Sequence, residues 1–227
     1  MLALGTAGTP LIMRLYFIHG GQRVWLSAFL ETAGFPLMLV PLEKLNHSHP
    51  PPSTTISITP EKLNIISMKP PIFFAAAFIG ILTGLDYYLF AYGVAQLPVS
   101  TSSSIIAPQL GFTAFFAFLL VKQKFTAFTV NAIVLLTVGS GILAMHTSSD
   151  RPASVSAKQY AISFSTTVAA SALYGFVLPS VELAYKKIKP PVFYSFVMEF
   201  QFVTCMFATL FCAIGMIANN DFKVRLC

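Results

Sequence analysis

Seven stretches of mostly apolar residues divide this sequence, and each is about as long as a helix that crosses a lipid bilayer. Such a helix needs about 20 residues. Only 10% of the 227 residues are charged, whereas a soluble domain carries about 25%. The sequence therefore predicts an all-α fold, a multi-pass bundle of membrane helices. The predicted helices cover residues 1–18, 24–42, 71–95, 98–121, 125–146, 159–184 and 192–218.

The lysine and arginine residues between these helices predict the orientation of the chain. Cytoplasmic loops of membrane proteins carry an excess of these residues. The segments after the second, fourth and sixth helices hold eight lysines, and the segments on the opposite side hold five lysine or arginine residues. We therefore expect a cytoplasmic N-terminus, and the expected location is the plasma membrane.

Composition and motifs argue against several classes of function. The net charge of +6 fits loops that meet lipid head groups, and no basic helix or base-stacking motif indicates nucleic-acid binding. The HExxH, GxSxG, GxGxxG and P-loop patterns are absent, so nothing indicates hydrolysis or nucleotide-driven pumping. The three cysteines suggest no disulfide framework, and we expect neither an enzyme nor a metal site.

Four carboxylates fall inside the predicted helices, where a charge costs about 2.5–3.5 kcal/mol at the bilayer centre. Glu182 lies four residues before Lys186, so an ion pair near the membrane surface accounts for it. Glu31 and Asp86 lie nearer mid-helix, and Glu199 lies shallower. For these three we expect substrate binding or proton coupling.

Two interpretations of Glu31 and Asp86 remain open. Each shares a helix face with small or hydroxyl-bearing residues, which favours an aqueous cavity. Burial favours the protonated form of a carboxyl group, so a carboxyl in such a cavity can load and release a proton near neutral pH. Alternatively, the acids pair with Arg14 or Arg23, or they lie closer to the interface.

The fourth predicted helix contains five hydroxyl residues at 100–104, then Pro108 and Gln109. Proline removes a backbone hydrogen bond and clashes with the preceding turn, so we expect a kink, as at Pro10 and Pro179. The Gln109 amide both donates and accepts hydrogen bonds, which is the pattern that the N6/N7 edge of adenine requires. The alternative is an interfacial helix start with a packing kink.

Aromatic residues make up 14% of the chain, and most are expected to face lipid. Trp25, Tyr87 and Tyr92 are the best candidates to stack on a flat base. The glycines of Gly80-x-x-x-Gly84 and of Gly139-Ser140-Gly141 are expected to let helices approach closely.

Two long segments resemble the plant purine permease family. They begin IMRLYFIHGGQRVWLSAFLETAGF (12–42) and DYYLFAYGVAQLPVSTSSSIIAPQLG (86–152). The family is part of the drug/metabolite transporter superfamily, and the resemblance implies ten helices in two inverted five-helix repeats. It also implies uptake of adenine, cytokinins or related nitrogenous bases, driven by a proton gradient and without another cofactor. The expected partners are thus a purine-like small molecule and the bilayer.

The chain departs from that pattern because it contains seven predicted helices. Residues 1–146 correspond to a first five-helix repeat, 147–158 to an inter-repeat loop and 159–227 to the first two helices of a second repeat. Such a chain resembles a truncated or alternatively spliced member. The alternative to a transporter is therefore a non-transporting fragment that associates with a full-length relative. A seven-helix receptor is disfavoured, because receptor motifs are absent and the N-terminus is predicted inside.

Overall fold

The computed structural model contains helices and no strands in the part of the chain that it describes, so the predicted all-α fold is confirmed. The helices are α2 (Val24–Thr32), α4 (Pro70–Gln96), α6 (Gln109–Phe116), α7 (Ala127–Thr147), α8 (Ala157–Lys186) and α9 (Tyr194–Ala218). A π-helical stretch, η2 (Ala117–Val121), extends α6. The described residues are 8, 11–13, 15–19, 21, 23–34, 36, 70–97, 108–147, 156–186 and 194–219.

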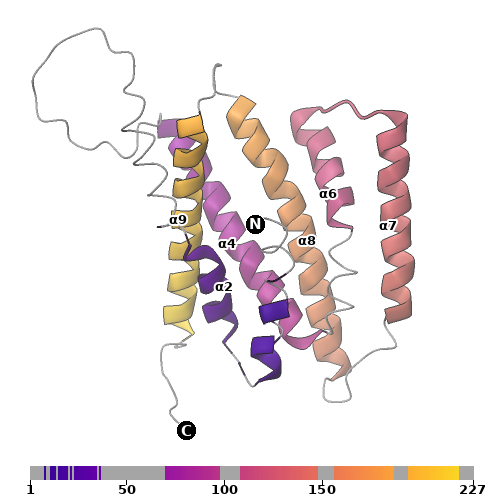
Figure 1. The fold of residues 1–227 in the computed structure, drawn as a ribbon, viewed down its shortest axis with the longest axis vertical. Coiled ribbons are helices and arrows are strands. Elements are labelled where there is room, and N and C mark those ends of the chain that lie inside the picture. The colour runs from indigo at the N-terminus through magenta and orange to yellow at the C-terminus, as the bar shows by residue number, and fades with distance from the viewer. Residues whose placement is uncertain are drawn as a thin grey trace, which may run out of the picture.

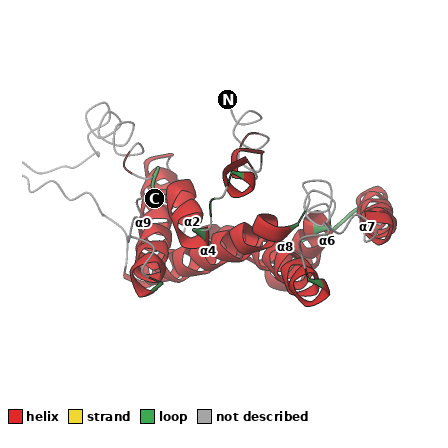
Figure 2. Ribbon diagram, turned by 90° about the horizontal axis from the view of Figure 1, so that it is seen from below, coloured by secondary structure: helices red, strands yellow, loops and turns green. Residues whose placement is uncertain are grey.

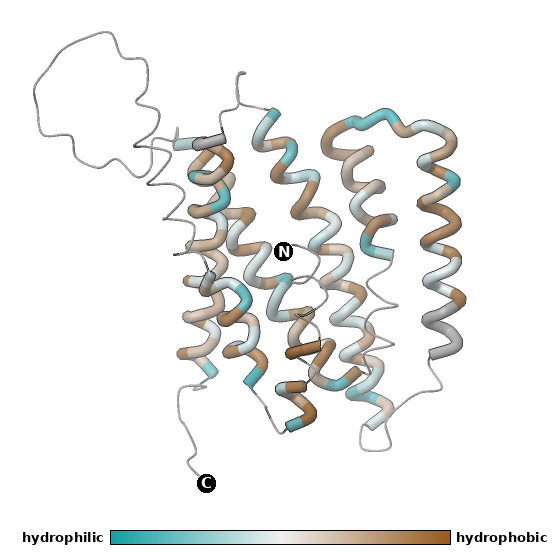
Figure 3. Tube along the Cα trace, viewed as in Figure 1, coloured by the Kyte–Doolittle hydropathy of each residue, from teal (hydrophilic) through white to brown (hydrophobic). Residues whose placement is uncertain are grey.

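Several of these helices suit a membrane. Three are long and apolar enough to cross one, judged by length and composition: Pro70–Gln96, Ala157–Lys186 and Phe196–Ala218. Two shorter apolar helices cover Gln109–Val121 and Ala127–Ile142. Hydrophilic residues gather at the connection between α6 and α7, whereas α7 itself is largely apolar (Figure 3). This distribution is that of helices which end at the membrane surface.

The helices form one curved layer in which α9, α4, α8, α6 and α7 follow one another (Figures 1 and 2). The central helix α4 packs against both α8 and α9, and the short α2 lies against α4 and α9. At the far end, α7 packs chiefly on α6. The division of the chain into two inverted repeats stays a prediction.

Close packing of α4 depends on glycine. A methyl group added at Gly80 would lie 2.5 Å from the Thr204 carbonyl oxygen of α9, and one at Gly84 would lie 3.0 Å from the Ala208 carbonyl oxygen. The prediction for this pair is thus confirmed. The prediction for Gly139 and Gly141 is wrong for the described residues, because no atom lies within 4 Å of a methyl group added at either glycine.

The helix predicted over residues 24–42 is shorter in the structure. It ends at Thr32, and residues 33–34 form a turn. Pro36 explains this end, because a proline disfavours the helical conformation of the residue before it. The Thr209 hydroxyl of α9 lies 2.9 Å from the Thr32 carbonyl oxygen and 2.8 Å from the Cys205 carbonyl oxygen of its own helix. Its one hydrogen is shared between these two acceptors, and the Thr32 carbonyl is among those that a helix end leaves unpaired. Residues 37–42 lie outside the described part.

Four of the remaining predicted helices are found with small changes, whereas most of the predicted helix at 1–18 lies outside the described residues. The bounds of α4, α7, α8 and α9 agree with the predicted ones within about two residues. Pro108 immediately precedes α6, and residues 98–107 lie outside the described part. Pro179 lies inside α8, which continues past it. Its kink stays a prediction, as does that at Pro10, which is also outside the described residues.

Candidate functional site

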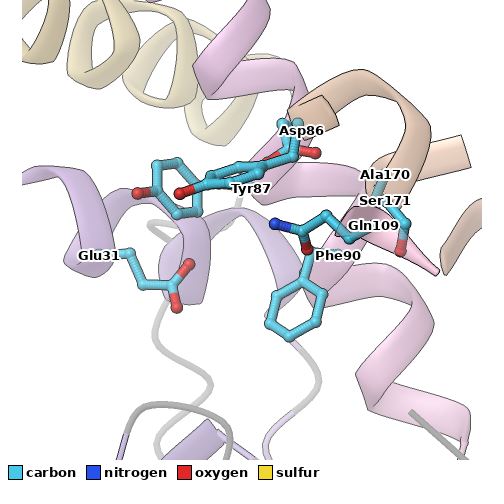
Figure 4. A pocket seen from close by; sticks show the side chains of 8 residues that line it. Glu31, Asp86, Tyr87, Phe90, Gln109, Ala170 and Ser171 are labelled. Atoms are coloured by element: carbon cyan, nitrogen blue, oxygen red, sulfur yellow. The ribbon is translucent and has the colours of Figure 1, made fainter. Parts of the chain in front are cut away.

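A cavity of about 180 Å³ lies where four helices meet (Figure 4). It contains four of the residues singled out from the sequence: Glu31 of α2, Asp86 and Tyr87 of α4, and Gln109 of α6. These positions span 79 residues of sequence, so the fold alone brings them together. Their functional role stays a prediction.

Four further residues complete the lining, and the sequence interpretation missed them. They are Phe90 of α4 and Ala170, Ser171 and Tyr174 of α8. Their spacing in the sequence could have indicated them, because α4 and α8 each contribute lining residues at positions i, i+1 and i+4. Positions four apart lie on one helix face. The polar face of α8 is also visible as a stripe of hydroxyl residues that precedes Tyr174.

The packing of α4 on α8 turns these two faces toward one another. Gly93 of α4 fits closely against Thr167 of α8, where a side chain larger than hydrogen would collide. Hydroxyl groups along this contact bond within α8: Thr167 donates to the Ser163 carbonyl at 2.7 Å, and Ser171 donates to the Thr167 carbonyl at 3.1 Å. The contact therefore needs no polar partner from the cavity.

The two carboxylates of the cavity are poorly satisfied. Asp86 is only 5% exposed, and its Oδ1 is buried without a hydrogen-bond partner within the described residues. The same holds for Oε2 of Glu31. Within the same part of the chain, no lysine or arginine lines the cavity. Arg23 is not at the cavity, and Arg14 lies outside the described residues.

The other intramembrane acids lie elsewhere. Glu182 forms the expected ion pair with Lys186 at 3.3 Å, on a surface where both side chains are about half exposed. Glu199 is 8% exposed on α9 and does not line the cavity.

Two of the three aromatic residues proposed to stack on a base also lie outside the cavity. The Trp25 ring stacks on Tyr88, with 3.9 Å between ring centroids and 19° between planes. It also lies directly over Gly215 of α9. Tyr92 is 6.4 Å from Tyr88, measured between centroids. Trp25 thus joins α2 to α4 and α9, and base stacking by Trp25 or Tyr92 stays a prediction.

The cavity has the size and chemistry to hold a small, flat, polar molecule. An engineered apolar cavity of about 150 Å³ binds benzene, so a volume near 180 Å³ suits a small aromatic ring system. Aromatic walls offer stacking surfaces, while an amide and two carboxyl groups offer donors and acceptors. Among the described residues, no group of three or more His, Cys, Asp or Glu could hold a metal ion.

These features are those of a membrane protein with a cavity between its helices. A family model described as "Purine nucleobase transmembrane transport" matches residues 1–225, so the chain belongs to this family, the purine permeases. Purine permease 3 of Arabidopsis thaliana is 49% identical over 98% of this chain and 62% of its own length. Purine permease 2 of the same plant is 50% identical over 99% and 62%. The chain thus spans about three fifths of these relatives.

Proposed function

We propose that this chain belongs to a secondary transporter that carries purine-type nucleobases across a membrane, with proton movement driving uptake. The observation that carries the proposal is the cavity, in which two carboxyl groups, an amide and aromatic rings meet from separate helices. The family match and the names of the relatives support the substrate class. The relatives named are permeases, and the chain acts in transport instead of catalysis.

Recognition of the base combines stacking and edge contacts. The rings of Tyr87 and Phe90 lie beside the cavity (Figure 4), and the flat face of a purine stacks on such rings without regard to its substituents. The Gln109 amide then distinguishes bases, because it pairs with a neighbouring donor and acceptor on the purine edge. A carboxylate accepts a further hydrogen bond from a purine N–H.

Proton coupling uses the cavity carboxyls. Asp86 is the seventeenth of the 27 residues of α4, which places it about 5 Å from the helix midpoint at 1.5 Å per residue. An ionisable group at this depth marks a substrate or proton pathway in many membrane proteins. The protein takes up a proton on the side with the higher proton concentration and releases it on the other. Where the proton gradient points into the cell, as we propose for the plasma membrane, the flux of the base is directed into the cell.

The test is uptake of radiolabelled adenine by yeast cells that lack their own purine permease and express this chain. We expect accumulation that rises as the external medium is acidified and that collapses with a protonophore. Glu182→Gln, which alters an exposed ion pair outside the cavity, should leave uptake unchanged, whereas Tyr87→Ala should abolish it. Absence of uptake by a chain that reaches the membrane would refute the proposal. That result would favour a non-transporting fragment that associates with a longer relative.

A further inference from the structure

We propose that Glu31 and Asp86 act as one proton site, so that the cavity holds one proton and one negative charge between two carboxyl groups. This inference rests on the proposed function for its biological meaning, because the proton held by the pair would be the one that moves with the base. It goes beyond the proposed function in two respects. It assigns the proton to the pair of carboxyl groups, and it predicts that one proton is transported with each base.

The first argument is the shortage of partners. Both acids line the same cavity, each has a buried oxygen without a hydrogen-bond partner in the described residues, and Asp86 is almost completely buried. Two ionised carboxylates would therefore share the cavity with no cation among the lining residues that the structure describes. A carboxylic acid, in contrast, can donate its proton to a base nitrogen, to cavity water or to the second carboxylate.

The second argument is the size of the cavity. A volume of about 180 Å³ is close to that of a cavity that holds one benzene molecule. Carboxyl groups on the walls of so small a space are screened less than exposed ones, above all Asp86, which is 5% exposed. Two like charges that share such a site oppose each other's ionisation, and where their interaction exceeds about one pH unit the protons belong to the pair.

The third argument is the position of Tyr87. Its ring extends from α4 into the space between the labelled carboxyl groups of Asp86 and Glu31 (Figure 4), and all three side chains line the cavity. A phenol hydroxyl both donates and accepts hydrogen bonds. It can therefore connect an ionised carboxylate with a protonated one through cavity water.

Among the residues that the structure describes, the other titratable side chains that line the cavity are the phenols of Tyr87 and Tyr174. Phenols are ordinarily neutral at pH 7. Neither of them neutralises a second carboxylate, and we expect a shared proton to do so. The pair takes this proton from water on one side of the membrane, where the carboxyl O–H bond forms before the base binds. The same O–H bond breaks when the proton leaves to water on the opposite side.

The experiment is an infrared titration of the purified full chain in lipid nanodiscs, which detects the C=O band of protonated carboxyl groups. Labelling with ¹³C-aspartate separates the aspartate bands from the glutamate bands. Because Glu199 is also buried, the part of the glutamate band that Glu199→Gln removes is subtracted. The remaining aspartate and glutamate bands should together account for one protonated carboxyl around neutral pH, and a total of two, or of none, would overturn the proposal.

Substitutions test whether the two acids are coupled. In Glu31→Gln the Asp86 band should titrate at a pH lower by about one unit or more, and Asp86→Asn should affect Glu31 in the same way. Glu182→Gln is the matched control and should change neither band. If each acid keeps its midpoint when the other is replaced, the pair does not exist, even if pH-driven uptake is normal. If the bands behave as a pair but no base is taken up, the proposed function fails and the proton site stands.

Discussion

Replacing Gly80 by alanine should weaken the contact between α4 and α9. The new methyl carbon would lie 2.5 Å from the Thr204 carbonyl oxygen and 2.8 Å from Cβ of Phe207, whereas ordinary contact begins near 3.4 Å. The two helices would therefore have to separate by about 0.9 Å, the difference between 3.4 and 2.5 Å. A gap of about 0.5–1 Å loses a quarter to a half of the dispersion energy of the atoms that face it.

The expected magnitude follows from two opposing effects. Overpacking a close contact costs about 1–3 kcal/mol, and alanine gains about 0.5–1 kcal/mol over glycine inside a helix. We expect Gly80→Ala to lose about 1 kcal/mol net, which lowers the apparent Tm by about 2–4 °C in a chain of this length. Gly139→Ala is the matched control, because its methyl group meets no atom within 4 Å. It should raise the apparent Tm instead.

The assay is thermal unfolding of the purified chain in detergent at one scan rate. The chain contains one tryptophan, and Trp25 packs where α2 meets α4 and α9, so its fluorescence reports on the region under test. The prediction is a difference in sign between the two glycine substitutions. If both raise the apparent Tm, α4 and α9 do not cross as closely as described.

Three further substitutions should change the free energy of unfolding, each by an amount that follows from one local structural feature. Trp25→Ala should cost at least about 2 kcal/mol, because the ring loses its stack on Tyr88; size-exclusion of heated samples measures this. Lys122→Gly should gain about 1 kcal/mol, because this residue has φ of 54°; the apparent Tm should rise. Thr209→Val should cost about 1–3 kcal/mol, because the Thr32 carbonyl loses its donor, and the apparent Tm should fall.

Each of these substitutions has a matched control. Phe128→Ala removes a ring that is 88% exposed and should change stability little. Lys124→Gly alters the same loop at a residue whose φ is not positive and should give no gain. The Thr137 hydroxyl bonds only within its own helix, to Ile133, so Thr137→Val should be close to neutral. Equal effects in a substitution and its control would contradict the contact assigned to it.

Long apolar helices could be predicted well because hydropathy alone determines them. The acids of the cavity could also be predicted, since a charge in hydrocarbon needs an enclosed polar space, and this argument applies to Asp86 whatever its neighbours are. Ala170 and Phe90 could not be predicted in the same way. An apolar residue gives no local sign of whether it faces lipid or a cavity, and the rotation of α8 depends on a distant contact between Gly93 and Thr167.

The glycine expectation that the structure contradicts and the shortened helix at 24–42 have different origins. Gly139 and Gly141 are small residues of the kind found where helices pack closely. Their sequence pattern does not show whether another helix lies opposite them, and such a contact needs one. The predicted helix at 24–42 followed hydropathy, which is high on both sides of Thr32. Backbone geometry ended the helix instead, since Pro36 follows within four residues.

The isolated position of α7 has a consequence for how its sequence can change. The helix meets a neighbour chiefly along α6, where Thr137 lies close to Gly111, and many of its large apolar side chains are exposed. The position of α7 therefore depends more on its partitioning into the apolar layer of the bilayer than on packing against neighbouring helices. Random replacement along α7 should be tolerated as long as mean hydropathy is kept, except that position 137 should not accept a side chain larger than valine beside Gly111. The same shuffling in α4 should destroy the protein.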